Sequence, residues 1–304
     1  MKGWLSKNRA FLFRLAGTSL ATGLIFFLIE QEGVGEIVSA VKQVSVGNFL
    51  FALAFLFLSR LFVSARWHVL VRSAGVDVPF VKTSALTFAG LFASNFLPTT
   101  IGGDVVRLVS AIQMGMDQAL ALASLAADRL IGMFGMACLL PFGVPPVWGS
   151  LGAPASQSLA LGGFFQGAWD FTKRTLQTFS IWFKRPTALL LSLVFTWLHT
   201  LCIIAAFSIV IAGLGDFVPL PLIAGLWSLA YFVTLVPVSI NGYGVQELSL
   251  TFLFSQVGGL GAAASLTVAV LIRLLYMAAS LPGAAYMPSI IAALDWQKQA
   301  KGKE

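Results

Sequence analysis

Long apolar stretches limit what this chain can fold into. Five of them, at 15–29, 47–65, 187–213, 219–236 and 261–281, reach or approach the roughly 20 residues that a helix needs to span a bilayer. Inside lipid every backbone N–H and C=O group needs a partner within the protein, and continuous apolar runs favour helices over the alternating strands of a barrel. We therefore predict an all-α fold, a polytopic transmembrane helical bundle of about six to eight spans.

A broken apolar motif occurs twice in the chain. Residues 95–107 read Asn-Phe-Leu-Pro-Thr-Thr-Ile-Gly-Gly-Asp-Val-Val-Arg, and residues 236–247 read Val-Pro-Val-Ser-Ile-Asn-Gly-Tyr-Gly-Val-Gln-Glu. A proline and a glycine align between the two motifs, and farther along Arg129 aligns with Arg273 after one small insertion. Segments interrupted by proline or glycine in both halves of a membrane protein indicate a transporter with a midplane binding site.

The repeat predicts two related halves within a single integral membrane domain, residues 1–304. The first half covers 10–141 and the second 187–293, each with a Pro/Gly-broken or re-entrant segment, and 142–186 forms a cytoplasmic or interfacial linker. The residues predicted to break or hinge the helices are Pro98, Gly102, Gly103, Pro237, Gly242 and Gly244. Proline removes a backbone donor and glycine permits unusual backbone angles. Helices that restart after such breaks expose N–H groups, which attract phosphate or carboxylate.

Basic residues predict the orientation of the chain. The first 14 residues contain four Lys or Arg and no acid, and the 170–186 loop is also rich in basic residues. The positive-inside rule places both in the cytoplasm. The formal net charge of +7 follows from the same bias, so no nucleic-acid partner is predicted. Arg60, inside an apolar stretch, is expected to snorkel to the cytoplasmic interface.

Charge inside apolar segments is the strongest indication of a site. Between Pro186 and Leu294 the charged residues are Asp216, Glu247 and Arg273, and the last two lie within apolar segments. An ionised group there costs at least about 2.5–3.5 kcal/mol, so it usually pairs or faces a cavity. Two interpretations stay open: a structural Glu247–Arg273 ion pair that fixes packing, or a substrate site.

The first half carries an equivalent group of charges. Asp104 and Arg107 are three residues apart and share a helix face, so they can pair locally. Arg129 keeps its sequence context in the second half, whereas Asp128 is replaced there by Ile272. We therefore rank Arg129 above Asp128 as a site residue.

Arginines and polar side chains near the two breaks make up the predicted site. The predicted substrate-binding residues are Arg107, Arg129, Arg273, Glu247, Asp104, Asn95, Thr99, Thr100, Asn241, Tyr243 and Gln246. The planar fork of arginine binds two phosphate oxygens, so a polar cavity lined by these residues near the midplane suits a phospholipid headgroup. His68 and His199 are too far apart for metal-ligand spacing, and no catalytic motif is present. We expect no metal, no cofactor and no enzymatic activity.

The motifs resemble the transmembrane, flippase-like region of the lysylphosphatidylglycerol synthase family. The resemblance rests on Arg66-Trp67, the 95–107 motif, Asp128-Arg129, the 237–247 motif and Arg273, and covers roughly residues 10–290. It implies a polytopic inner-membrane protein from a family implicated in moving lipids between leaflets. Full synthases append a soluble domain that transfers lysine from aminoacyl-tRNA to phosphatidylglycerol. This chain ends at Glu304, so the expectation is that it does not make the modified lipid.

The sequence thus predicts a flippase- or scramblase-like protein that moves or binds a phospholipid or lipid-linked headgroup between leaflets. No nucleotide-binding motif is present, so we expect downhill or ion-coupled movement. The alternative is a non-transporting accessory protein that binds lipid and recruits an envelope-lipid biosynthetic enzyme through the basic 142–186 loop. An intramembrane enzyme would need a nucleophile and a base near Glu247, and the sequence supplies no convincing pair.

Overall fold

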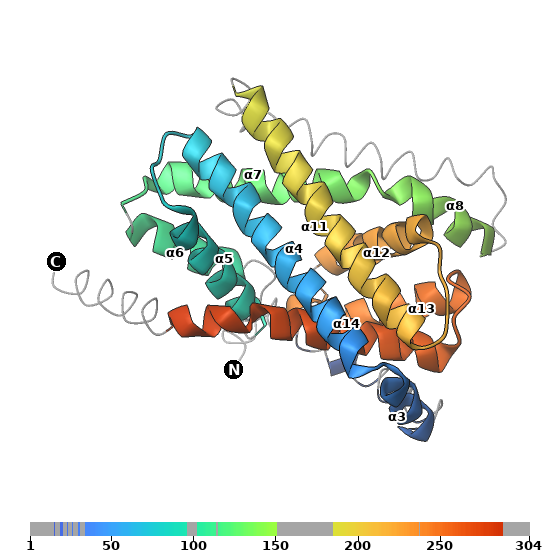
Figure 1. Ribbon diagram of the computed structural model, residues 1–304. Coiled ribbons are helices and arrows are strands. Elements are labelled where there is room, and N and C mark those ends of the chain that lie inside the picture. The colour runs from blue at the N-terminus through green and yellow to red at the C-terminus, as the bar shows by residue number, and fades with distance from the viewer. Residues whose placement is uncertain are drawn as a thin grey trace, which may run out of the picture.

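The computed structural model describes residues 34–95, 102–113, 115–150, 185–236 and 238–287, together with single positions between 15 and 30. This described part is helical throughout (Figure 1). Its elements are α3 (Val34–Gln43), α4 (Val46–Ser73), α5 (Phe80–Ser94), α6 (Gly102–Gln113), α7 (Gln118–Ala137), α8 (Leu140–Ser150), α11 (Pro186–Gly213), α12 (Leu220–Leu235), α13 (Val245–Gln256) and α14 (Ala262–Ser280), with 3-10 helices η3 (Ile240–Gly242) and η4 (Leu281–Tyr286).

Within the described residues, four helical segments are long and apolar enough to cross a membrane: Val46–Ser73, Gln118–Ala137, Pro186–Gly213 and Ala262–Tyr286. Helices α5 and α12 are apolar but shorter, with 15 and 16 residues. The prediction of an all-helical membrane protein is confirmed. The first apolar stretch and most of the linker lie outside the described residues, so the number of crossings stays a prediction.

Helix lengths recur in the same order along the chain. Helices α4 and α11 each have 28 residues, α5 and α12 have 15 and 16, α6 and α13 each have 12, and α7 and α14 have 20 and 19. The series α4–α7 therefore corresponds element by element to the series α11–α14. This order defines equivalent positions in the two halves.

The turn that follows each long helix is also the same. Segments 75–79 and 215–219 both begin with a glycine at positive φ, 97° for Gly75 and 83° for Gly215. In both, the glycine N–H donates to a carbonyl three residues back at 3.0 Å, and both segments end in Val-Pro with the valine buried. Because L side chains rarely adopt such φ angles, the glycine sets where each long helix ends and the next begins.

Helices α4 and α11 lie side by side and antiparallel (Figure 1). Asn48 at the start of α4 meets Gly213 at the end of α11. Halfway along, Ser59 Oγ and His199 Nδ1 are 2.6 Å apart, and each is the fourteenth residue of its helix. Equivalent residues that touch across an antiparallel pair place an approximate two-fold axis at this contact, as in an inverted repeat.

Each half then forms a helical hairpin. Helix α5 runs back along α4, with the rings of Phe57 and Phe88 5.4 Å apart, and α6 returns along α5. The two arms of this hairpin touch through backbone: a Cβ on Gly90 would lie 2.6 Å from the carbonyl oxygen of Gly103. Helices α12 and α13 form the second hairpin against α11, whose Phe207 ring lies 5.7 Å from that of Phe254.

The hairpins enter the bundle from opposite ends. The first starts at the end of α4 and the second at the end of α11, and these two ends lie far apart because the long helices are antiparallel (Figure 1). Helices α5 and α6 pack against each other as the two arms of a helical hairpin, and whether this hairpin is re-entrant stays a prediction.

Candidate functional site

An acid–arginine ion pair occupies the same place in each half. Asp104 pairs with Arg129 in the first half, and Glu247 pairs with Arg273 in the second. Each acid is the third residue of the second hairpin arm, α6 or α13, and each arginine is the twelfth residue of the following helix, α7 or α14. The structure contains the Glu247–Arg273 ion pair that the sequence allows.

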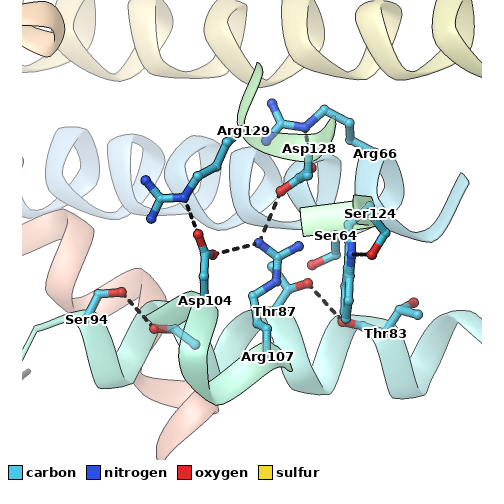
Figure 2. A network of polar contacts seen from close by, with 12 residues as sticks. Ser64, Arg66, Thr83, Thr87, Ser94, Asp104, Arg107, Ser124, Asp128 and Arg129 are labelled. Atoms are coloured by element: carbon cyan, nitrogen blue, oxygen red, sulfur yellow. Dashed lines mark hydrogen bonds and ion pairs between the residues drawn. The ribbon is translucent and has the colours of Figure 1, made fainter. Parts of the chain in front are cut away.

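The first-half pair belongs to a longer chain of alternating charges (Figure 2). Arg107 Nη1 lies 3.3 Å from Asp104 Oδ1, which confirms the predicted local pair, and 3.1 Å from Asp128 Oδ2. Arg66 Nε donates to Asp128 Oδ1 at 2.7 Å. With three arginines and two aspartates, the cluster Arg129–Asp104–Arg107–Asp128–Arg66 carries a surplus of one positive charge.

Asp128 is the buried centre of this cluster, although the sequence ranks it below Arg129. Its residue exposure is 2%, and it joins α7 to Arg66 on α4 and Arg107 on α6. Arg66 is likewise missing from the predicted site. The signal that could have found both is their charge within apolar segments. Comparison of the two halves hid this signal, because the uncharged Ile272 stands at the position equivalent to Asp128.

Aromatic packing fixes the Arg107 guanidinium. Its carbon lies 4.3 Å from the ring centroid of Trp67, and the indole Nε1 of Trp67 donates to Ser124 Oγ at 3.2 Å. Arg107 is 6% exposed, and its Nε and Nη2 have no hydrogen-bond partner within the described part of the chain. Two buried donors with no protein acceptor mark a place where an anion can bind.

The second-half pair is built around the helix break. The backbone turns through three left-handed residues, Asn241, Gly242 and Gly244, with φ of 50°, 73° and 77°. Glu247 Oε2 accepts the Gly244 N–H at 2.8 Å, which caps α13. Arg273 donates to the Gly242 carbonyl oxygen at 3.3 Å. The predicted hinge glycines Gly242 and Gly244 thus hold the ion pair through the backbone.

The two halves meet at the hairpin tips. The Arg273 guanidinium carbon lies 4.8 Å from the ring centroid of Tyr243, and Tyr243 Oη donates to the carbonyl oxygen of Asn95 at 2.9 Å. Asn95 follows the last residue of α5, and its Nδ2 donates to Ser280 Oγ at 2.9 Å. The predicted residues Asn95 and Tyr243 therefore lie together, 148 residues apart in sequence.

The structure describes some of the other predicted residues and not the rest. Gly102 and Gly103 are the buried first residues of α6, and Gln246 lies beside Glu247 in the first turn of α13. Pro98, Thr99, Thr100 and Pro237 lie outside the described residues. The start of the predicted linker forms α8, which packs on α12 through Gly143 and Gly225, and residues 151–184 are not described.

A cavity of about 480 Å³ lies away from these charges. It opens where α11 ends and α14 begins, and its lining includes Gln43, Leu214, Asp216 and Gly261. None of the predicted site residues lines it. Among the described residues, no group of three or more His, Cys, Asp or Glu is placed to hold a metal ion.

Comparison with known proteins agrees with the sequence motifs. Residues 14–283 match the protein family described as the lysylphosphatidylglycerol synthase TM region. The chain is also similar to a UPF0104 membrane protein of Pyrococcus horikoshii, with 23% identity over 111 residues. That match spans 36% of this chain and 33% of the relative.

Proposed function

Because this chain belongs to the lysylphosphatidylglycerol synthase TM region family, we propose that it translocates a phosphate-bearing lipid headgroup between the leaflets of the cytoplasmic membrane. The observation that carries the proposal is the pair of acid–arginine sites, Asp104–Arg129 and Glu247–Arg273, on hairpins that enter the bundle from opposite ends. Inverted repeats with broken helices at the midplane are the architecture of alternating-access transporters.

The ion pairs suit a site that holds no lipid during part of the proposed transport cycle. Each arginine is neutralised by a carboxylate while no lipid is bound, so the cost of a lone charge inside the bundle is avoided. A phosphate binds arginine through two parallel N–H···O bonds, and it can take the place of the carboxylate on the guanidinium. The surplus positive charge of the first-half cluster favours an anionic headgroup over an uncharged one.

The two sites differ in exposure. The Arg129 side chain is 39% exposed and that of Arg273 is 15% exposed, while the values for Asp104 and Glu247 are 16% and 7%. The first-half site is therefore the more open one in this conformation. In the proposed cycle the second-half site opens when the first-half site closes.

The proposed topology has six to eight crossings (~20 residues each), with the N-terminus and the 170–186 loop in the cytoplasm. Arg185, just before α11, donates to the carbonyl oxygen of Ser73, the last residue of α4. Arg72 lies at this same end of the bundle, so basic residues from both segments gather on one side. This supports the cytoplasmic assignment under the positive-inside rule.

Leaflet exchange in proteoliposomes tests the function. Fluorescent phosphatidylglycerol and phosphatidylcholine would be followed with wild type, Arg273→Ala, Glu247→Ala and the control Arg72→Ala, whose side chain pairs with Asp77 on the exposed surface. We expect exchange of phosphatidylglycerol by wild type and by the control, and a loss of about tenfold or more in both site variants, equivalent to about 1.4 kcal/mol.

The same assay separates translocation from the accessory function. If folded wild-type protein moves neither lipid faster than protein-free liposomes, the translocation proposal is wrong. The protein would then act by binding lipid and recruiting an envelope-lipid biosynthetic enzyme. If the site variants exchange lipid at the wild-type rate, the Glu247–Arg273 pair is structural only.

A further inference from the structure

Arg60 lies at the centre of the bundle, beside the contact that relates the two halves. It is the fifteenth residue of α4, next to Ser59, which touches His199 of α11. The sequence predicts that Arg60 snorkels to the interface, and this prediction is wrong. The end of α4 is about 20 Å away at 1.5 Å per residue, and the guanidinium lies over Tyr276 of α14, 4.4 Å from its ring centroid.

The Tyr276 ring is a rigid platform for this arginine. Its other neighbour is Trp227, whose ring is stacked on it at 5.8 Å with an interplanar angle of 15°. Trp227 in turn packs against the fully buried Phe207, 5.4 Å away. Because the aromatic stack holds one face of the guanidinium, its N–H groups are oriented for an acceptor at the edge.

Among the residues that the structure describes, no acid balances the charge of Arg60. None of the ion pairs formed within the described residues includes Arg60, and its buried Nε has no hydrogen-bond partner there. The hydroxyl of Tyr276 is buried without a partner in the same region. A cation–π contact is weaker than the cost of placing a charge at the membrane centre. The aromatic contact alone does not offset that cost, but a bound anion would.

Arg60 also lies between the two acid–arginine sites. Along α4 it is six residues, about 9 Å, from Arg66 of the first-half cluster. Across the bundle it contacts Tyr276, which is one helical turn beyond Arg273 of the second-half pair. The position equivalent to Arg60 in α11 is Thr200, which donates to the Thr196 carbonyl oxygen at 2.9 Å. Of these two equivalent central positions, one is an arginine, and it lies within reach of both halves.

We propose that Arg60 is an intermediate binding site for the phosphate of an anionic lipid that moves between the two acid–arginine sites. The inference rests on the proposed function, because it assigns a third position to the same lipid. When the two halves exchange conformations, a residue beside the approximate two-fold axis keeps its place. Arg60 can therefore receive the headgroup from one site and release it to the other.

Lipid binding by purified protein in detergent tests this intermediate binding site without requiring transport. Thermal unfolding midpoints would be titrated with dioctanoyl phosphatidylglycerol, dioctanoyl phosphatidylcholine and sodium phosphate for wild type, Arg129→Gln, Arg60→Leu and the double variant. In Arg129→Gln, Asp104 keeps Arg107 as a partner. We expect Arg129→Gln to weaken stabilisation by phosphatidylglycerol, and the double variant to bind it about tenfold more weakly again.

Controls make each outcome decisive. Arg72→Leu removes an exposed arginine from the same helix and should titrate as wild type. Arg60→Gln gives the same test where Arg60→Leu does not fold, and Arg60→Lys should retain part of the affinity because the charge remains. If the double variant titrates as Arg129→Gln does, Arg60 is not a binding site for the phosphate. Equal stabilisation by sodium phosphate would identify free phosphate as the ligand, and equal stabilisation by phosphatidylcholine would reject anion selectivity.

Leaflet exchange distinguishes this inference from the proposed function. With translocation intact, Arg60→Leu should slow phosphatidylglycerol exchange about tenfold while Arg72→Leu does not. Wild-type protein that moves no lipid would reject translocation, and the titrations would still decide whether Arg60 binds the phosphate.

Discussion

The two halves bury different chemistry at equivalent positions. The equivalent pairs are Arg66 and Ala206 in α4 and α11, Arg107 and Leu250 in α6 and α13, and Asp128 and Ile272 in α7 and α14. All six residues are at most 7% exposed. In the first half, charged residues hold the three helices together. In the second half, apolar residues of the main core occupy the equivalent positions.

The difference shows that this contact does not require charge. Replacing a buried ion network with apolar residues of similar volume is often neutral or stabilising. The second half has the apolar version, and its helices have the same lengths as those of the first half to within one residue. The first-half charges therefore call for a role beyond packing, and the unpartnered donors of Arg107 agree with binding of an anion.

The largest expected effect comes from breaking the charged network at its centre. Asp128→Ile places the second-half residue in the first half while Arg66 and Arg107 remain buried. Arg66 then loses its acidic partner and Arg107 keeps only Asp104 among the described residues, which should lower the free energy of unfolding by about 3–5 kcal/mol. Unfolding in mixed micelles with increasing sodium dodecyl sulfate, followed by tryptophan fluorescence, measures this. A loss below about 1 kcal/mol, the range of exposed pairs, would show that water or lipid already compensates the arginines.

Completing the replacement should recover most of that loss. The triple variant Arg66→Ala, Arg107→Leu, Asp128→Ile copies the second half in full, and Asp104 keeps Arg129 as a partner. We expect an unfolding free energy within about 1–2 kcal/mol of wild type together with loss of phosphatidylglycerol exchange. A triple variant that is stable and still exchanges lipid would show that the cluster is dispensable for transport.

The shared turns should respond alike in the two halves. Gly75→Ala and Gly215→Ala each force a side chain into a positive-φ position, and neither site has an atom within contact of the new Cβ. The cost is conformational, about 1 kcal/mol for each variant. The same detergent unfolding series measures both. A difference between them of more than about 1 kcal/mol would mean that the turns are not equivalent in stability.

The smallest effect is expected at an exposed ion pair that is not among the compared positions of the two halves. Arg72 pairs with Asp77 at 3.5 Å, with side-chain exposures of 60% and 94%. Arg72→Ala should change the unfolding free energy by less than about 1 kcal/mol, because exposed pairs contribute little. A larger loss would indicate a further contact for Arg72 at this end of the bundle.

Local patterns were sufficient for part of the site. The short spacing of Asp104 and Arg107 allowed a local pair, and the charges of Glu247 and Arg273 within apolar segments gave an ion pair as one of two interpretations. The structure shows both pairs. Comparison of the two halves failed where they differ, because it lowered the rank of Asp128. The snorkelling expected of Arg60 failed because the sequence does not show that Tyr276 lies beside it.

By itself the sequence determined that the chain is a helical membrane protein with two broken segments. Helices depend on backbone hydrogen bonds between residues four apart, and apolar length and Pro/Gly breaks are local properties of the chain. The tertiary structure decided that the halves are antiparallel, that Tyr243 meets Asn95 and that Arg66 meets Asp128, 62 residues away. These contacts depend on how helix surfaces fit together across the bundle, which no short stretch of sequence encodes.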